Sequence, residues 1–287
     1  MWTRQRSLLL LINLEAIMTD LKTIYSARVK ESIKPLFETP KELRGIFLKS
    51  STDIGVIRNN GRNGAKYAPK AVMFNFKKMT QDHDLKNWQF SEIEVSCEES
   101  ELKDFANAQK QETQKIQTAL TNNFEFLCHI GGGHDHIYPL IKALAPQYEK
   151  VVVINIDAHA DTRTDDEFHS GTPFRQLDQE LEHFKLFQIG LHPYSNSFST
   201  LSPLKSEMNV LWRKECQEAN ISAFFEKIQN EVTTKTLVTL SVDADALCGH
   251  LVPAVSAVNA DGLDLDTLKF IMEKYLSMNF THAPVLG

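Results

Sequence analysis

Four short apolar runs along the chain predict strands that are buried on both faces. They cover residues 126–130, 151–156, 186–191 and 237–242. Each has the length of a strand and contains few polar positions, as is typical of the interior of a parallel sheet. Segments of helical length separate them, and in residues 102–120 and 265–276 the apolar positions recur with a helical period. This alternation predicts a three-layer αβα fold with a central, mainly parallel sheet.

The domain organisation is predicted to be simple. No Pro/Gly/Ser-rich linker and no repeat of about 20 to 50 residues interrupts the alternation, so we expect one domain over residues 19–287. Residues 1–18 are expected to form an N-terminal extension of uncertain structure. Their short apolar run resembles a signal peptide, but Asn13 and Glu15 follow it and Met18 has the context of a natural start.

Composition narrows the possible partners and the compartment. The formal net charge is -6, which provides no basic field for nucleic acid and favours a small-molecule substrate. No run approaches the roughly 20 apolar residues of a membrane span. The four cysteines form no CxxC pair, so we expect reduced thiols and a cytoplasmic protein, with neither a zinc knuckle nor a disulfide framework.

Residues with metal-binding chemistry follow three of the predicted strands. The segments are GGGHDH at 131–136, DAHAD at 157–161 and SVDAD, which ends at Asp245. In open α/β sheets the ligand crevice lies beyond the carboxyl ends of the strands. Because residues two apart in an extended chain point to the same side, we expect the acidic and histidine side chains within each segment to converge. The glycines before His134 allow a close backbone turn that presents it at the same edge.

Four carboxylates in one crevice require positive charge. Without cations some of them would have to remain protonated, whereas two divalent ions would balance four negative charges. An oxygen-rich set with two imidazoles suits Mn²⁺ better than a structural zinc site, which would be richer in cysteine. We therefore expect two Mn²⁺ per protomer. The six candidate ligands are His134, Asp157, His159, Asp161, Asp243 and Asp245.

The three segments, in this order and at these separations, resemble the motifs of the arginase/agmatinase/formimidoylglutamase (ureohydrolase) family. The resemblance extends over about residues 53–287. It implies that Asp157 and Asp243 serve both metal ions. His134 and Asp161 complete one ligand set, and His159 and Asp245 complete the other.

The resemblance also implies the reaction, which is hydrolysis of a C–N bond of a linear amidine. Water between two ions about 3.5 to 4 Å apart is acidified and can attack the trigonal carbon. The leaving amine needs a proton, and His169 is the candidate general acid because agmatinase-like members carry a histidine just before their Gly-Thr. A solvated loop histidine is the simpler alternative for His169.

Within the family, the strings GGGH, DAHxDxR and SGTPFRQ are closest to formimidoylglutamase, whose substrate N-formimidoyl-L-glutamate carries two carboxylates. Arg163, Arg58 and Arg62, with Asn63 beside the last, are the candidate substrate-binding residues, because arginine pairs well with carboxylates. Each arginine alone is as readily explained as a solvated surface charge. The expected products are L-glutamate and formamide, as in histidine degradation.

Two other functions stay open. One is a guanidino hydrolase of arginase, agmatinase or guanidino-acid type, which would release urea. The other is a truncated, non-catalytic metal-binding paralogue, because the chain ends at 283–287 as a strand begins, where relatives continue with an acidic residue and a final helix. We accordingly expect a fold that lacks the C-terminal strand and helix. The resemblance also favours a homo-oligomer.

Overall fold

The computed structural model describes residues 43–79, 88–97, 104–120, 123–201 and 204–287. The expected N-terminal extension and the first two residues of the predicted helix 102–120 lie outside these ranges. The strands of the described part are β1 (Leu43–Ser50), β2 (Trp88–Glu94), β3 (Phe126–Gly131), β4 (Lys150–Ile156), β5 (Phe184–Leu191), β6 (Met208–Trp212), β7 (Thr236–Val242) and β8 (Val285–Leu286).

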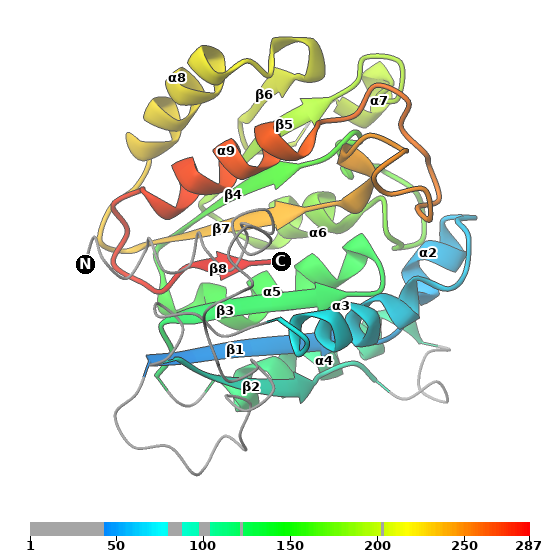
Figure 1. Ribbon diagram of the computed structural model, residues 1–287, viewed down its shortest axis with the longest axis vertical. Helices are drawn as coiled ribbons and strands as arrows, with labels where there is room; N and C mark the ends of the chain where they lie inside the picture. Colours follow the sequence, from blue (N-terminus) through cyan, green and yellow to red (C-terminus); the bar gives the residue numbers. More distant parts are fainter. Residues whose placement is uncertain (1–42, 80–87, 98–103, 121–122, 202–203) are drawn as a thin grey trace, which may run out of the picture.

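The four strands predicted from apolar runs are β3, β4, β5 and β7, with ends that differ by at most two residues. All strands pair in parallel in one eight-stranded sheet of order β2-β1-β3-β8-β7-β4-β5-β6. Strands β2 and β6, which were not predicted, lie at the two edges. An edge strand needs less apolar surface than a central one, so its run is shorter and less distinct. Figure 1 shows the resulting twisted sheet.

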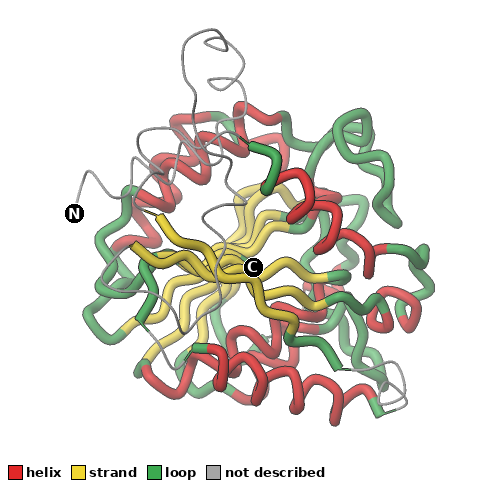
Figure 2. The backbone as a smooth tube through the Cα atoms, turned by 60° about the horizontal axis from the view of Figure 1, so that its bottom comes forward, coloured by secondary structure: helices red, strands yellow, loops and turns green. Residues whose placement is uncertain are grey.

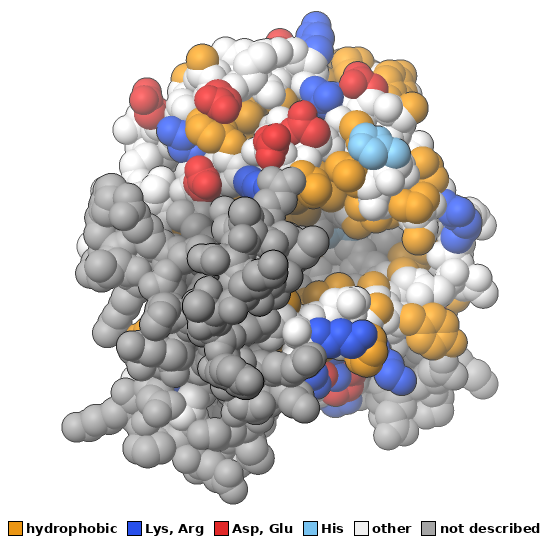
Figure 3. Space-filling view, viewed as in Figure 1, with side chains coloured by type: hydrophobic (Ala, Val, Ile, Leu, Met, Phe, Trp, Pro, Cys, Tyr) orange, Lys and Arg blue, Asp and Glu red, His pale blue; other side chains and the backbone are white. Residues whose placement is uncertain are grey.

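Helices cover both faces of the sheet, as the three-layer prediction requires (Figure 2). On one face α4 (Phe105–Ala119) contacts α5 (Ile137–Leu144), which contacts α6 (Pro173–Glu180). On the other face lie α3 (Ala68–Phe76), α8 (Glu218–Gln229) and α9 (Leu265–Leu276). Two short helices, α2 (Ile54–Arg58) and α7 (Phe198–Leu201), lie in connections. The space-filling view shows a hollow between the α9 side and the α3 side (Figure 3).

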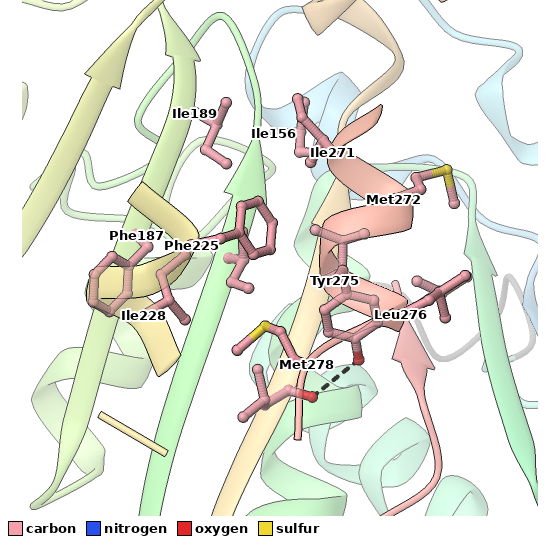
Figure 4. Packing of buried hydrophobic residues seen from close by; sticks show 14 of the residues in the cluster. Ile156, Phe187, Ile189, Phe225, Ile228, Ile271, Met272, Tyr275, Leu276 and Met278 are labelled. Carbon is pink, nitrogen blue, oxygen red and sulfur yellow. Dashed lines mark hydrogen bonds between the residues drawn. The ribbon is translucent and has the colours of Figure 1, made fainter. Parts of the chain in front are cut away.

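Helix α9 has the bounds that its apolar period predicts. The Asp264 carboxylate accepts a hydrogen bond from the Thr267 N–H and caps its N-terminus. Ile271 and Tyr275 are fully buried against the sheet (Figure 4). The Tyr275 hydroxyl lies 3.1 Å from the Val238 carbonyl oxygen and accepts a hydrogen bond from the Val285 N–H at 2.9 Å. One side chain thus joins α9 to both β7 and β8.

Strand β8 occupies the centre of the sheet, between β3 and β7. Its pairing is extended by Gly287, whose N–H donates to the Leu240 carbonyl and whose carbonyl accepts from the Val242 N–H. The expectation that the fold lacks its C-terminal strand is therefore wrong, because the last few residues are enough to pair with both neighbours, and β8 brings its carboxyl end to the same edge as β7. No helix among the described residues is long and apolar enough to cross a bilayer.

Candidate metal centre

The three motif segments meet at the carboxyl ends of β3, β4 and β7, which the sheet order places within four adjacent strands. After β3 the chain makes a tight turn into the 3₁₀ helix η5 (His134–His136). A Cβ on Gly132 would lie 2.1 Å from the Thr52 carbonyl oxygen, so this position needs glycine. The turn lets the backbone pass close to the loop after β1 and directs His134 towards the ends of β4 and β7.

The first cluster of candidate ligands contains four residues, His134, Asp157, Asp161 and Asp243, with ligand atoms within 4.8 Å of one another. Nδ1 of His134 lies 3.1 Å from Oδ2 of Asp157 and 2.8 Å from Oδ2 of Asp161. The Asp243 Oδ2 lies 3.3 Å from the same nitrogen. This is the set that the family resemblance implies for one ion.

The second cluster contains Asp157, His159 and Asp245. Nδ1 of His159 lies 3.1 Å from Oδ2 of Asp245 and 3.6 Å from Oδ1 of Asp157. Asp157 therefore belongs to both clusters. The resemblance implies that Asp243 is also shared, but in the structure Asp243 belongs to the first cluster only.

The local backbone brings these side chains together differently from the extended geometry expected above. Residues 157–161 follow β4 as a turn, and Asp161 has a left-handed φ of 50°. Asp243 and Asp245 flank the start of a 3₁₀ turn, in which the Asp243 carboxylate accepts from the Asp245 N–H. Turns, rather than strand alternation, direct neighbouring acids into different clusters, so the expected convergence occurs for another physical reason.

Crowding of like charges perturbs the carboxylates. Burial, assisted by repulsion from Asp157, raises the pKa of Asp161 to about 6. Burial, assisted by Asp243 and Asp157, raises the pKa of Asp245 to about 8. Hydrogen bonds to Asp157 and Asp245 raise the pKa of His159 to about 11, against the opposing effect of its burial. The cluster thus attracts positive charge strongly.

Polar residues that the sequence reasoning missed support the ligands. Ser241 Oγ lies 2.8 Å from Nε2 of His134, on the side away from the carboxylates. The Asn155 amide donates to Oδ2 of Asp157 at 3.3 Å and to Gln188 at 2.8 Å, and both amides are fully buried. The signal was present in the sequence, since Asn155, Gln188 and Ser241 are polar residues within otherwise apolar strands.

A buried ion pair supports the turn that carries His134. Both nitrogens of His136 face acceptors, because Nδ1 lies 2.9 Å from a Glu112 carboxylate oxygen and Nε2 lies 3.0 Å from the Thr52 carbonyl. Burial alone would lower the pKa of His136, but the Glu112 and Asp135 carboxylates raise it to about 10. The side chains of His136 and Glu112 are 6% and 4% exposed, so the pair is desolvated.

The candidate general acid His169 is buried in the loop between Asp161 and α6. Its Nδ1 accepts a hydrogen bond from the Gly171 N–H, and its Nε2 lies 2.6 Å from Oδ2 of Asp165. The loop returns to the DAHAD segment, because the Arg163 N–H donates to the Gly171 carbonyl.

The candidate substrate-binding residues fall into two groups. Arg163 and Arg58 each bridge the end of α2 and the loop 161–172, a boundary that we call the polar seam. Arg163 Nη1 donates to Asn59, next to Arg58, at 2.6 Å, and Arg58 Nε donates to the Phe168 carbonyl at 2.9 Å. Arg62 and Asn63 are exposed further along the same loop, and the Arg62 N–H donates to Ser256 Oγ. The structure therefore places Arg58 and Arg163 at this seam and gives the side chains of the other two no comparable contact among the described residues.

A second hollow, of about 740 Å³, lies at the opposite edge of the sheet, near the beginnings of β4 and β5. Two of its three lysines, Lys150 and Lys185, pair with Glu231, and Lys185 also lies 3.8 Å from Glu207. The candidate metal ligands instead cluster at the carboxyl ends of the strands, away from this hollow.

Comparison with known proteins identifies the family. Residues 51–285 match the model of a family described as the arginase family. Formimidoylglutamase from Lysinibacillus sphaericus is 29% identical over 245 residues, which cover 80% of this chain and 72% of the relative. The solved formimidoylglutamase from Bacillus subtilis superposes with a TM-score of 0.78 at 21% identity, covering 94% of this chain and 85% of that one. Trypanosoma cruzi formiminoglutamase with Mn²⁺ gives a TM-score of 0.71 at 22% identity, covering 91% and 90%.

Proposed function

Because this chain belongs to the arginase family and is a hydrolase of amidine C–N bonds, we propose that it binds two Mn²⁺ and hydrolyses N-formimidoyl-L-glutamate to L-glutamate and formamide. The observation that carries the proposal is the pair of ligand clusters that share Asp157. Support for the substrate comes from the similarity to formimidoylglutamases and from two arginines beside the clusters.

The donor set fits a pair of manganese ions. Four carboxylates carry four negative charges, which two divalent ions would neutralise, and the oxygen-rich set with two imidazoles matches Mn²⁺ preferences. Oδ1 of Asp245 is buried and has no hydrogen-bond partner among the described residues, and an ion would satisfy it. His134, Asp157, Asp161 and Asp243 would hold one ion, and Asp157, His159 and Asp245 the other.

The bound ions would acidify a water molecule and stabilise the negative charge that develops at the amidine carbon. The protein residues supply orientation. Ser241 fixes the His134 ring so that Nδ1 faces the carboxylates, and Asn155 fixes one oxygen of Asp157. As an imidazolium, His169 would give the leaving amine its Nε2 proton and become a neutral imidazole. Nε2 must then exchange its partner Asp165 for the amine, and Nδ1, which carries the second proton, must release the Gly171 N–H.

The substrate carboxylates would be bound by Arg163 and Arg58, whose guanidinium groups can form paired hydrogen bonds with them. A dicarboxylate substrate thus explains why two arginines lie on one seam near a cluster that itself attracts cations. Arginine or agmatine would bring a cationic guanidinium and fewer carboxylates to the same seam, so either would pair less well with the two arginines.

Two measurements test the proposal. Metal analysis after manganese reconstitution should find close to two Mn²⁺ per chain, and Asp157→Asn should reduce binding of both because this residue lies in both clusters. A panel of N-formimidoyl-L-glutamate, arginine and agmatine should then give glutamate and formamide fastest. Faster release of urea from arginine or agmatine would instead assign the chain as a guanidino hydrolase. Two bound ions without turnover would favour a non-catalytic role.

A further inference from the structure

The carboxylate of Asp165 is shared between two candidate functional residues. Its Oδ2 lies 2.5 Å from Nη2 of Arg163 and 2.6 Å from Nε2 of His169. A single oxygen therefore contacts the guanidinium expected to bind substrate and the imidazole expected to donate a proton.

The two contacts of Asp165 differ in their solvent exposure. The side chains of Arg163 and Asp165 are 45% and 38% exposed, whereas that of His169 is 5% exposed. Ion pairs between exposed groups contribute little free energy, so an incoming carboxylate can replace Asp165 on Arg163 at small cost. The contact with the buried imidazole is better protected from water.

The hydrogen bonds of His169 determine which ring nitrogen carries the proton. Nδ1 accepts from the Gly171 N–H, so in the neutral ring the proton is on Nε2 and is donated to Asp165. Asp165 can therefore keep its bond to His169 when Arg163 turns to another anion, until Nε2 passes its proton to the leaving amine.

The second candidate arginine has the same kind of partner from the same segment. Arg58 Nη2 lies 2.8 Å from Oε2 of Glu167, whose side chain is 75% exposed. Both arginines of the seam thus contact carboxylates supplied by residues 165–167. Asp166, between them, is exposed and forms no hydrogen bond or ion pair with any described residue.

We propose that Asp165 occupies Arg163 in place of a substrate carboxylate, and that substrate binding displaces it and leaves it bound to His169 alone. The inference rests on the proposed function in so far as it assumes a carboxylate substrate. Asp165 is then a specificity-determining residue, because only a ligand with a carboxylate at this position can compete for Arg163.

The test is the affinity for L-glutamate, the proposed product, measured by calorimetry on the manganese-loaded protein. Asp165→Asn should bind L-glutamate about threefold more tightly or better, because the competing charge is removed while the side-chain shape is kept. Asp166→Asn removes an equal charge one residue away and should change the affinity much less. Asp165→Ser, which is smaller, should behave as Asp165→Asn does, with manganese stoichiometry and circular dichroism confirming that each variant is folded.

Turnover provides a second readout that a purely structural role would not produce. Asp165→Asn should lower KM for N-formimidoyl-L-glutamate and also lower kcat, since Arg163 is freed while His169 loses its anionic partner. Equal glutamate affinity in the wild type and Asp165→Asn, an equal gain in Asp166→Asn, or no glutamate binding in any of them would overturn the inference. The proposed function is judged separately, on wild-type turnover, and its failure leaves the affinity comparison intact.

Discussion

Ser241 Oγ lies 2.8 Å from Nε2 of His134, while Nδ1 of the same ring faces the carboxylates of the first cluster. The serine is the penultimate residue of β7 and fully buried, so its position is fixed by the sheet. A hydrogen bond on one ring nitrogen determines which nitrogen is available as a ligand. The sheet therefore sets the orientation of a side chain that arrives from the end of β3.

Ser241→Ala is expected to weaken manganese binding about tenfold, because partners of ligating histidines commonly contribute factors of this order. Titration of the metal-free protein with Mn²⁺ measures the effect. Thr239→Val is the matched control, since Thr239 is a buried hydroxyl residue two positions earlier in β7 whose Oγ1 has no hydrogen-bond partner among the described residues. Equal manganese affinity for Ser241→Ala and Thr239→Val would contradict the orienting role.

Glu112→Gln is expected to destabilise the fold by about 3 to 5 kcal/mol, because it leaves the buried His136 without its anionic partner. Burial alone would raise the pKa of Glu112, but the charge and hydrogen bond of His136, the charge of His129 and the hydrogen bond from Ser50 hold it below its usual range, so the carboxylate is ionised in the folded protein. Urea unfolding at neutral pH measures the loss. Exposed Glu94 pairs with Lys49 at 3.7 Å, and Glu94→Gln should cost about 1 kcal/mol or less. Similar losses for the two variants would show that the buried pair contributes no more than a surface pair.

The sequence was sufficient for β3, β4, β5 and β7 and for the cluster residues, because β4 and β7 are uninterrupted apolar runs directly followed by acids. It was not sufficient for β8, which was expected to be lacking. It did not reveal β1, whose residues 43–50 mix charged and apolar positions, or the two edge strands. It also predicted convergence from an extended geometry that Asp161 does not adopt. Contacts between distant segments, such as Ser241 with His134, depend on strand order, which local patterns do not encode.

Arg175→Lys is expected to weaken manganese binding through the backbone of Asp161. The buried Arg175 donates from Nε and Nη2 to the Thr162 carbonyl at 3.0 and 2.7 Å, next to the left-handed Asp161. A left-handed non-glycine residue costs about 1 kcal/mol or more and needs support from its surroundings. Lysine keeps the charge but has no paired donors, so a several-fold loss of affinity is expected in a manganese titration. Unchanged affinity would mean that the turn holds its shape without this contact.

Glu231→Gln should give a pH-dependent loss of stability far from the metal centre. Hydrogen bonds from Lys150 and then Lys185 hold the pKa of the Glu231 carboxyl below its ordinary value. A carboxyl group with a lowered folded pKa contributes stability above its unfolded pKa, and this contribution is lost as the pH falls through the folded value. With a quarter of the side chain exposed, solvent screening limits the effect to about 1 kcal/mol at pH 7. Urea unfolding of wild type and variant should therefore differ at pH 7 and converge in acid below the lowered pKa.

The difference in stability between wild type and Glu231→Gln should also shrink in about 1 M salt, where charges are screened within about 3 Å. Exposed Glu226 on α8 has no ion pair with a described residue, and Glu226→Gln should stay within about 0.5 kcal/mol of wild type at both pH values. A loss in Glu231→Gln that persists unchanged in acid would assign the effect to packing rather than to charge.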